Sequence, residues 1–159
     1  MPTVIEGHLN GSNKRFAIVA SRWNSFFSEQ LIAGAIDSLR RHGTKEEDIT
    51  LIRCPGSFEL PQTAAWALKH LDVDGIICLG VLIRGSTPHF DFIAAEAAKG
   101  IGALTMDSTI PLSFGVITCD TLEQAVERSG SKAGNKGEEA AMAALEMACL
   151  YDALKEAHS

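Results

Sequence analysis

The sequence has little positive charge, no closely paired cysteines and no long apolar run. Lys and Arg number 14 against 20 Asp and Glu, giving a formal net charge of -6, and this balance argues against nucleic-acid or anionic-membrane partners. The four cysteines are scattered without a CxxC pair, so we expect reduced, structural thiols. The apolar stretches are shorter than the roughly 20 residues of a membrane span, and the first residues do not resemble a signal peptide. We therefore expect a soluble cytoplasmic protein.

Short apolar runs alternate with stretches of helical spacing along the 159 residues, which fit one domain. We expect an N-terminal arm over residues 1–13 and an α/β core over residues 14–159. The expected strands are Phe16 to Ala20, Ile49 to Arg53, Gly75 to Ile83 and Phe114 to Thr118. The expected helices are Phe27 to Leu39, Glu59 to His70, Phe90 to Ile101, Thr121 to Arg128 and Gly137 to Lys155.

Four strand–helix units without an internal repeat predict an open, parallel, four-stranded sheet with helices on both faces, a flavodoxin-like three-layer sandwich. Residues Thr3 to Gly7 also look β-like, but Gly11 to Asn13 separate them from the first buried strand. We expect them to form an edge strand on a neighbouring subunit, and an edge position on the chain's own sheet is equally compatible with the pattern.

Ligands of such sheets bind beyond the carboxyl ends of the strands. Trp23 follows the first strand, Phe58 and Glu59 follow the second, and His89 follows the third. Aromatic faces stack on planar rings and a carboxylate accepts hydrogen bonds from hydroxyls, so these residues suit a heterocycle with a polyol chain. Core packing is the competing interpretation for any one aromatic residue, and their common position at one sheet edge weakens it.

The third strand ends in a segment suited to an anion. Thr87 is expected to be the N-cap of the next helix, with Pro88 at its first position and His89 in its first turn. Free backbone N–H groups at such a helix start attract phosphate. A solvated histidine beside a good helix start is the simpler interpretation of His89, but its place after the longest buried strand favours function.

The segment from Gly130 to Gly137 is rich in glycine and lysine. It does not match the Walker phosphate loop, because Asn135 and Gly137 flank Lys136 where that pattern needs Gly and Ser or Thr. Arg128, Lys132 and Lys136 supply positive charge for an anion, although a kinked connection with solvated lysines fits equally well. We find neither metal-ligand spacing nor a Ser-His-Asp order.

Five segments carry a family resemblance: Arg22 to Asn24, Pro55 to Pro61, Gly80 to Asp91, Phe114 to Val116 and Glu127 to Gly137. In this order and spacing the chain resembles the 6,7-dimethyl-8-ribityllumazine synthase family of riboflavin biosynthesis over nearly its whole length. The pattern Gly-x-x-Ile-Arg-Gly-x-Thr-x-His, followed by Lys-Ala-Gly-Asn-Lys-Gly, is the most specific part. Trp23 departs from the Phe of many relatives, and either ring can stack.

The resemblance implies a transferase that condenses 5-amino-6-(D-ribitylamino)uracil with 3,4-dihydroxy-2-butanone 4-phosphate, releasing lumazine, phosphate and water without a metal or redox cofactor. A non-catalytic shell protein that binds flavin or lumazine is the alternative. A response-regulator-like switch is a weaker one, because it needs acidic residues where Ser21, Arg22 and Arg84 stand.

The resemblance also implies residue roles. The ribitylaminouracil would contact Trp23, Ser57, Phe58, Glu59, Val81, Leu82, Ile83 and Phe114. The butanone phosphate would contact Ser86, Thr87 and Arg128. His89 would be the catalytic acid–base group, and Lys136 a possible accessory residue.

Members of the family form pentamers whose active sites lie between adjacent subunits, so Phe114 and Arg128 would come from the neighbour. The chain has no insertion between its last two helices and no proline within Val4 to Ser12, features that in the family accompany a sixty-subunit icosahedral shell. We therefore expect a homopentamer within such a capsid, with riboflavin synthase as a candidate partner.

Overall fold

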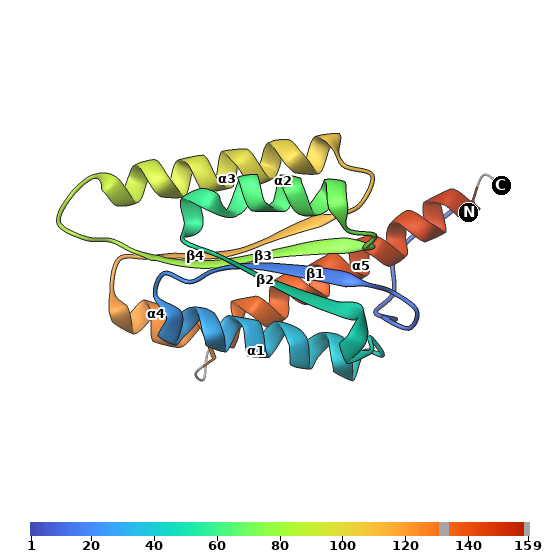
Figure 1. The fold of residues 1–159 in the computed structure, drawn as a ribbon. Coiled ribbons are helices and arrows are strands. Elements are labelled where there is room, and N and C mark those ends of the chain that lie inside the picture. The colour runs from blue at the N-terminus through green and yellow to red at the C-terminus, as the bar shows by residue number, and fades with distance from the viewer. Residues whose placement is uncertain (131–133, 158–159) are drawn as a thin grey trace.

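The described residues form three layers, with a parallel sheet between two layers of helices (Figure 1). The structure is a computed structural model and describes residues 1–130 and 134–157. The strands are β1 (Phe16–Ser21), β2 (Ile49–Cys54), β3 (Gly75–Ile83) and β4 (Leu112–Cys119). The helices are α1 (Ser25–Arg41), α2 (Leu60–His70), α3 (His89–Asp107), α4 (Leu122–Arg128) and α5 (Lys136–Glu156), with short 3-10 turns at Glu46–Asp48 and Ser57–Glu59.

The sheet is parallel throughout, with strand order β2-β1-β3-β4. Helices α2 and α3 cover one face, and α1, α4 and α5 cover the other (Figure 1). All of β1 is buried, as expected for a strand packed on both faces. Its alternate side chains serve two cores, with Ile18 facing α1 and α5 and Val19 facing α2. The flavodoxin-like expectation is confirmed.

The winding of the chain reverses between β1 and β3. The connection from β1 leads outward to β2, and the connection from β2 returns across β1 to β3. Because the strands are parallel, Ser21, Cys54, Ile83 and Cys119 all end at one edge of the sheet. This edge is the place where open α/β sheets bind ligands.

Two local expectations need correction. Helix α3 begins at His89 with Pro88 as its N-cap residue, so the predicted cap Thr87 lies one position before the observed one. The Thr87 hydroxyl accepts a hydrogen bond from the His89 amide at 3.4 Å. Helix α3 also continues to Asp107, six residues beyond the predicted Ile101. No proline or positive-φ glycine interrupts that extension, so nothing ends the helix earlier.

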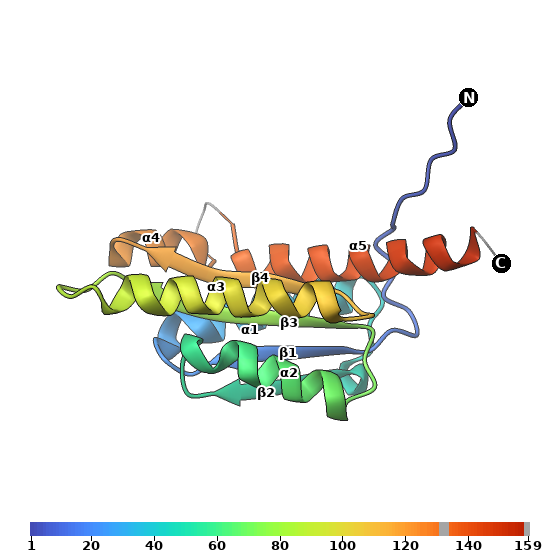
Figure 2. The ribbon, with the colours of Figure 1, turned by 90° about the horizontal axis from the view of Figure 1, so that it is seen from above.

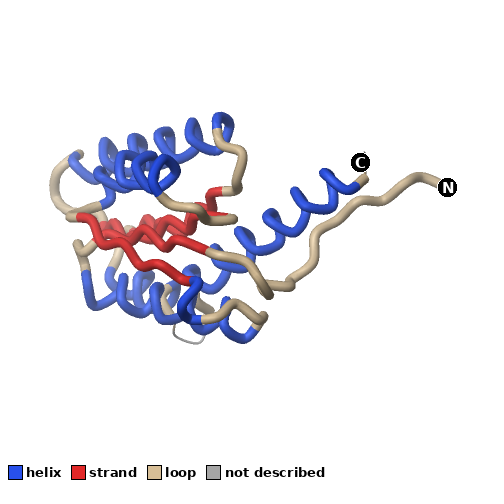
Figure 3. The backbone as a smooth tube through the Cα atoms, turned by 45° about the vertical axis from the view of Figure 1, so that its right-hand side comes forward, coloured by secondary structure: helices blue, strands red, loops and turns tan. Residues whose placement is uncertain are grey.

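Residues 1–13 do not join the chain's own sheet. The arm passes along α5, where a Cβ at Gly7 would lie 2.2 Å from the Glu146 carbonyl oxygen, and the Cys149 thiol donates to the Asn10 carbonyl at 3.4 Å. Beyond this contact the arm leaves the body of the molecule, as Figures 2 and 3 show. Pairing with a neighbouring subunit stays a prediction. The four cysteines are free, as expected.

Gly137 sets how closely α5 approaches α1. A Cβ at this position would lie 2.1 Å from the Leu31 carbonyl oxygen, a backbone atom that cannot move aside. We predict that Gly137→Ala lowers the free energy of unfolding by about 1–3 kcal/mol, as overpacking does. In Gly102→Ala the added carbon meets nothing within 4 Å inside the chain, so this control should keep or raise stability. Urea unfolding measures both, and equal effects would contradict the packing argument.

Candidate active site

A cavity of about 710 Å³ opens at the carboxyl edge of the sheet, between the loops after β1, β2 and β3 and the first turns of α3. Its lining includes most of the residues expected there from sequence: Trp23, Ser57, Phe58, Glu59, Leu82, Ile83, Thr87 and His89. The fold therefore gathers residues from three separate loops around one space. Of the remaining predicted residues, Ser86 is exposed outside this lining and Val81 is buried in the core.

The two aromatic walls of the cavity are held by the turns that follow their strands. Trp23 and Phe58 are exposed over 68% and 57% of their surface, so their ring faces are free to stack on a ligand. Asn24, next to Trp23, takes the left-handed conformation with φ 59°. Its side-chain amide donates to the Val81 carbonyl at 2.8 Å, which ties the Trp23 turn to β3.

The end of β3 offers free backbone groups to the cavity. β3 pairs with β1 only as far as Leu79, whereas its pairing with β4 continues to Ile83. The backbone of Val81, Leu82 and Ile83 therefore has no ladder partner on the β1 side. Asn24 uses one lone pair of the Val81 carbonyl, and the second remains available for a ligand.

Ser57 lies under this strand end with its hydroxyl buried. The side chain is 3% exposed, and its Oγ has no hydrogen-bond partner among the described residues. A Cβ at Gly80 would lie 2.8 Å from this oxygen, so the glycine makes room for it. A buried hydroxyl without a partner is costly, and a ligand or water that reached it would remove that cost.

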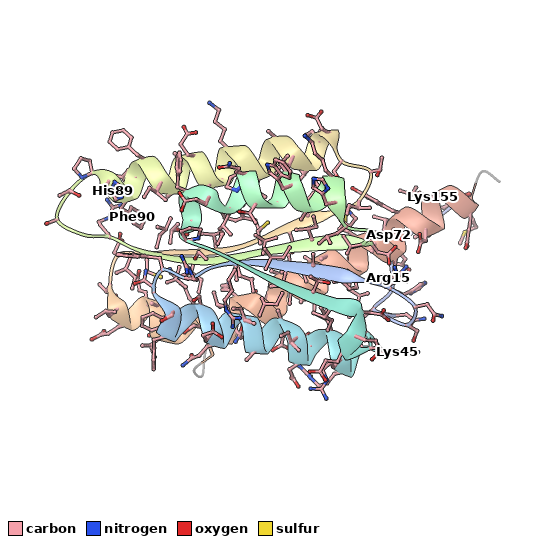
Figure 4. All side chains as sticks on the ribbon, viewed as in Figure 1. Arg15, Lys45, Asp72, His89, Phe90 and Lys155 are labelled. Carbon is pink, nitrogen blue, oxygen red and sulfur yellow. The ribbon has the colours of Figure 1, made fainter. Side chains whose placement is uncertain are left out.

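Arg84 fixes the loop that carries Thr87 and His89. Its Nε donates to Asp120 at 2.8 Å and its Nη1 to Asp91 at 3.3 Å, and its guanidinium lies 4.5 Å from the centre of the Phe90 ring. These hydrogen bonds, to Asp120 first and then to Asp91, raise the pKa of Arg84 above its ordinary value. Residue 84 thus connects the ends of β3 and β4 with the first turn of α3, where Figure 4 places His89 and Phe90.

Sequence analysis missed part of the cavity wall. Ile93 and Glu96 line the cavity from α3, one and two turns after His89. Their spacing of four and seven residues from His89 places all three on one helix face. That spacing is the signal that could have found them. Glu96 gives the cavity a second carboxylate, after Glu59.

Phe114, Arg128 and Lys136 line a second cavity of about 490 Å³, formed by β4, α4 and α5. None of them lines the first one. The Arg128 guanidinium donates to the Thr118 carbonyl at 3.1 Å and to the Cys119 sulfur at 3.7 Å, while Lys136 pairs with Glu139 at 3.2 Å. The chain alone does not bring these residues to His89. Lys132 lies outside the described residues.

Three of the cysteines are buried and line neither cavity. Burial raises the pKa of the Cys78 thiol to about 12 and also raises the pKa of Cys54 and of Cys119, the latter opposed by Arg128. These thiols stay protonated near neutral pH and are poor nucleophiles. In the described part of the chain no His, Cys, Asp and Glu cluster has a metal-binding arrangement, and no helix is long and apolar enough to cross a membrane.

A sequence model of the 6,7-dimethyl-8-ribityllumazine synthase family matches residues 13–152. The chain belongs to this family. It is 57% identical over 150 residues to the 6,7-dimethyl-8-ribityllumazine synthase of Chlorobaculum tepidum, covering 94% of this chain and 97% of that protein. It is 53% identical over 152 residues to the lumazine synthase of Aquifex aeolicus, covering 96% and 99%. The family resemblance drawn from the motifs is confirmed.

The lumazine synthase of Chlorobium limicola is similar to the same extent, with 57% identity over 147 residues that cover 92% of this chain and 95% of that protein. The matched region holds both cavities. The aromatic walls, the β3 end, the His89 loop and the Arg128–Lys136 segment therefore all lie within the part shared with the family.

We predict that Arg84→Met loosens the segment from Gly85 to Asp91, because two ion pairs and one ring contact are lost together. Hydrogen–deuterium exchange of peptides from this segment should rise by about two- to fivefold, since exposed pairs are individually weak. Arg53→Met is the matched control, because Arg53 lies on the edge strand β2 and forms a comparably exposed ion pair with Glu29 of α1. Unchanged exchange in Arg84→Met would contradict the assigned role of Arg84.

Proposed function

We propose that the chain condenses 5-amino-6-(D-ribitylamino)uracil with 3,4-dihydroxy-2-butanone 4-phosphate. The products are 6,7-dimethyl-8-ribityllumazine, phosphate and two waters, and the step is the penultimate one of riboflavin biosynthesis. The observation that carries the proposal is the cavity at the carboxyl edge, where Trp23, Phe58 and Glu59 share one lining with His89 in a member of the lumazine synthase family.

The uracil substrate binds between the loops after β1 and β2. Trp23 stacks on its ring, Phe58 and Glu59 hold the ring edge and ribityl chain, and Ser57 lies beneath them. The free backbone edge of β3 from Val81 to Ile83 pairs with the polar atoms of the uracil. Adjacent N–H and C=O groups on a strand match such an edge, because both the donor and the acceptor are fixed in direction.

The butanone phosphate binds at the start of α3. Ser86 and Thr87 present hydroxyl and backbone N–H groups beside the first turn, where the helix dipole favours an anion. Arg128 of the neighbouring subunit clamps the phosphate, with Lys136 as an accessory cation and Phe114 closing the uracil side. This arrangement joins the two cavities of adjacent subunits into one site. It explains why the chain holds both halves on separate surfaces.

His89 moves protons between the reactants. Attack of the uracil amine on the butanone carbonyl forms an imine and releases water, and loss of phosphate and ring closure with a second dehydration follow. Each of these steps needs a proton accepted or donated near α3. Holding both reactants in contact lowers the barrier further, because it removes the entropic cost of their encounter. No metal or redox cofactor is needed.

The alternative is a non-catalytic shell that binds flavin or lumazine. Such a protein would need neither the proton transfer assigned to His89 nor the phosphate contact assigned to Arg128. Incubating the purified chain with both substrates separates the two functions. We expect lumazine absorbance and fluorescence to appear only when both substrates are present. Flavin binding without any lumazine formation would favour the alternative.

We predict that His89→Ala lowers turnover by about 100-fold without abolishing it, the lower range for loss of a general acid–base group. The remaining activity comes from reactant positioning. His70→Ala is the matched control, because His70 stacks on Trp66 on α2 and does not line the cavity. Complete loss of lumazine formation in folded His89→Ala, measured by fluorescence, would refute the positional account.

We also predict that Arg128→Ala and His89→Ala subunits complement each other in mixed pentamers. With random mixing of equal amounts, roughly a quarter of the shared sites receive both wild-type residues. Lumazine formation should therefore exceed that of either variant dissociated and reassembled alone. Native mass spectrometry verifies mixing, and mixed pentamers without recovered activity would contradict a shared site.

The larger assembly is a separate prediction, drawn from the family resemblance. Twelve such pentamers would form the sixty-subunit shell, with the arm of residues 1–13 paired to a neighbour's sheet. The shell, a cytoplasmic location and an association with riboflavin synthase stay predictions.

A further inference from the structure

The side chain of Asn135 makes four hydrogen bonds to three different elements. Its Oδ1 accepts from the backbone N–H groups of Gly137 at 2.8 Å and Glu138 at 3.1 Å, which caps α5. Its Nδ2 donates to the backbone carbonyls of Gln30 on α1 at 3.0 Å and Ser129 after α4 at 3.1 Å. Both amide hydrogens and two oxygen lone pairs are thereby used.

The neighbouring residues are shaped around this amide. A Cβ at Gly34 of α1 would lie 2.5 Å from the Asn135 side-chain amide, so only glycine leaves room for it. Ser129 is fully buried, its backbone forms an antiparallel bridge with that of Asn135, and its hydroxyl donates to the Gln30 side chain at 3.2 Å. The two ends of the connection between α4 and α5 are therefore fastened together and onto α1.

These hydrogen bonds hold the backbone next to two cationic residues. Arg128 immediately precedes Ser129, and Lys136 immediately follows Asn135, and both line the cavity of about 490 Å³. Both side chains are long and flexible. The region that each charged group can reach is therefore centred on the position of its own backbone. The bonds of the Asn135 side chain to Ser129 and Gln30 add to the backbone bridge between Ser129 and Asn135, so their loss would loosen the coupling between the two backbone positions.

We propose that Asn135 is a positioning residue for the substrate phosphate. Its amide sets the spacing of Arg128 and Lys136, so that a phosphate monoester meets two cations whose backbone positions are already held together. The inference rests on the proposed condensation, in which the butanone substrate carries the phosphate. Preorganisation of this kind improves binding because the ordering cost is met during folding.

A helix cap alone would not require the two donated hydrogen bonds, and this difference defines the test. Asn135→Asp keeps both cap acceptors at the start of α5 but replaces the donors to Gln30 and Ser129 by a carboxylate oxygen. Asn135→Ser is a neutral variant that can also cap but lacks those donors. Agreement between the two variants separates the lost donors from the added negative charge.

We expect the KM for the butanone phosphate to rise about tenfold in both variants, since small misplacements of binding groups are costly. The KM for the uracil should change less than twofold. Both variants leave the Gln30 and Ser129 carbonyls without the Asn135 donor, so we also expect the temperature of thermal unfolding to fall. Inhibition by inorganic phosphate gives a second readout, and its inhibition constant should rise in parallel. Ile76→Val, a core change at the amino end of β3, controls for lost stability.

The outcomes distinguish this inference from the proposed function. If the wild-type chain forms no lumazine, the proposed function itself fails. If the wild type is active but both variants keep the wild-type KM for the butanone phosphate, Asn135 is a cap and the positioning inference is overturned. Equal changes in the KM of both substrates, as in a generally destabilised variant such as Ile76→Val, would overturn it too.

Discussion

The unequal pairing of β3 is the constraint on which the site depends. Its ladder with β1 stops at Leu79, while its ladder with β4 runs on to Ile83. The strand end therefore stays rigid on one side and offers unpaired backbone groups on the other. Because the winding reverses between β1 and β3, the loop after β1 leads to α1 on one face of the sheet and the loop after β3 leads to α3 on the other, which leaves the cavity open.

Each half of the site is held by one polar side chain with several partners. Arg84 joins β3, β4 and α3 around the His89 loop, and Asn135 joins α1, α4 and α5 around the Arg128–Lys136 segment. Both residues use short-range, directional hydrogen bonds to hold the ends of segments that carry binding groups. Loops that carry binding groups need such fastening, since their own burial contributes little order.

The order of elements could be predicted from sequence because each buried strand is a short apolar run and most helices show their spacing. β3 matches its predicted bounds at Gly75 and Ile83. The start of α3 was predicted one residue too early, since Thr87 is the favoured N-cap type and Pro88 suits the first helical position, whereas Pro88 itself occupies the N-cap. Glu96 was not predicted as a cavity residue, because its position there depends on which face of α3 meets the cavity. The fastening by Asn135 was missed because its partner Gln30 is 105 residues away.

The sequence by itself determined the fold class, the family and most of the residues expected at the site, because these follow from local patterns and motif order. Tertiary structure alone decided which of those residues share a surface. Trp23, Glu59 and His89 meet because parallel strands end at one edge, whereas Phe114 and Arg128 lie in a separate cavity on β4, α4 and α5. Sheet register and winding fix that division, and no local pattern records them.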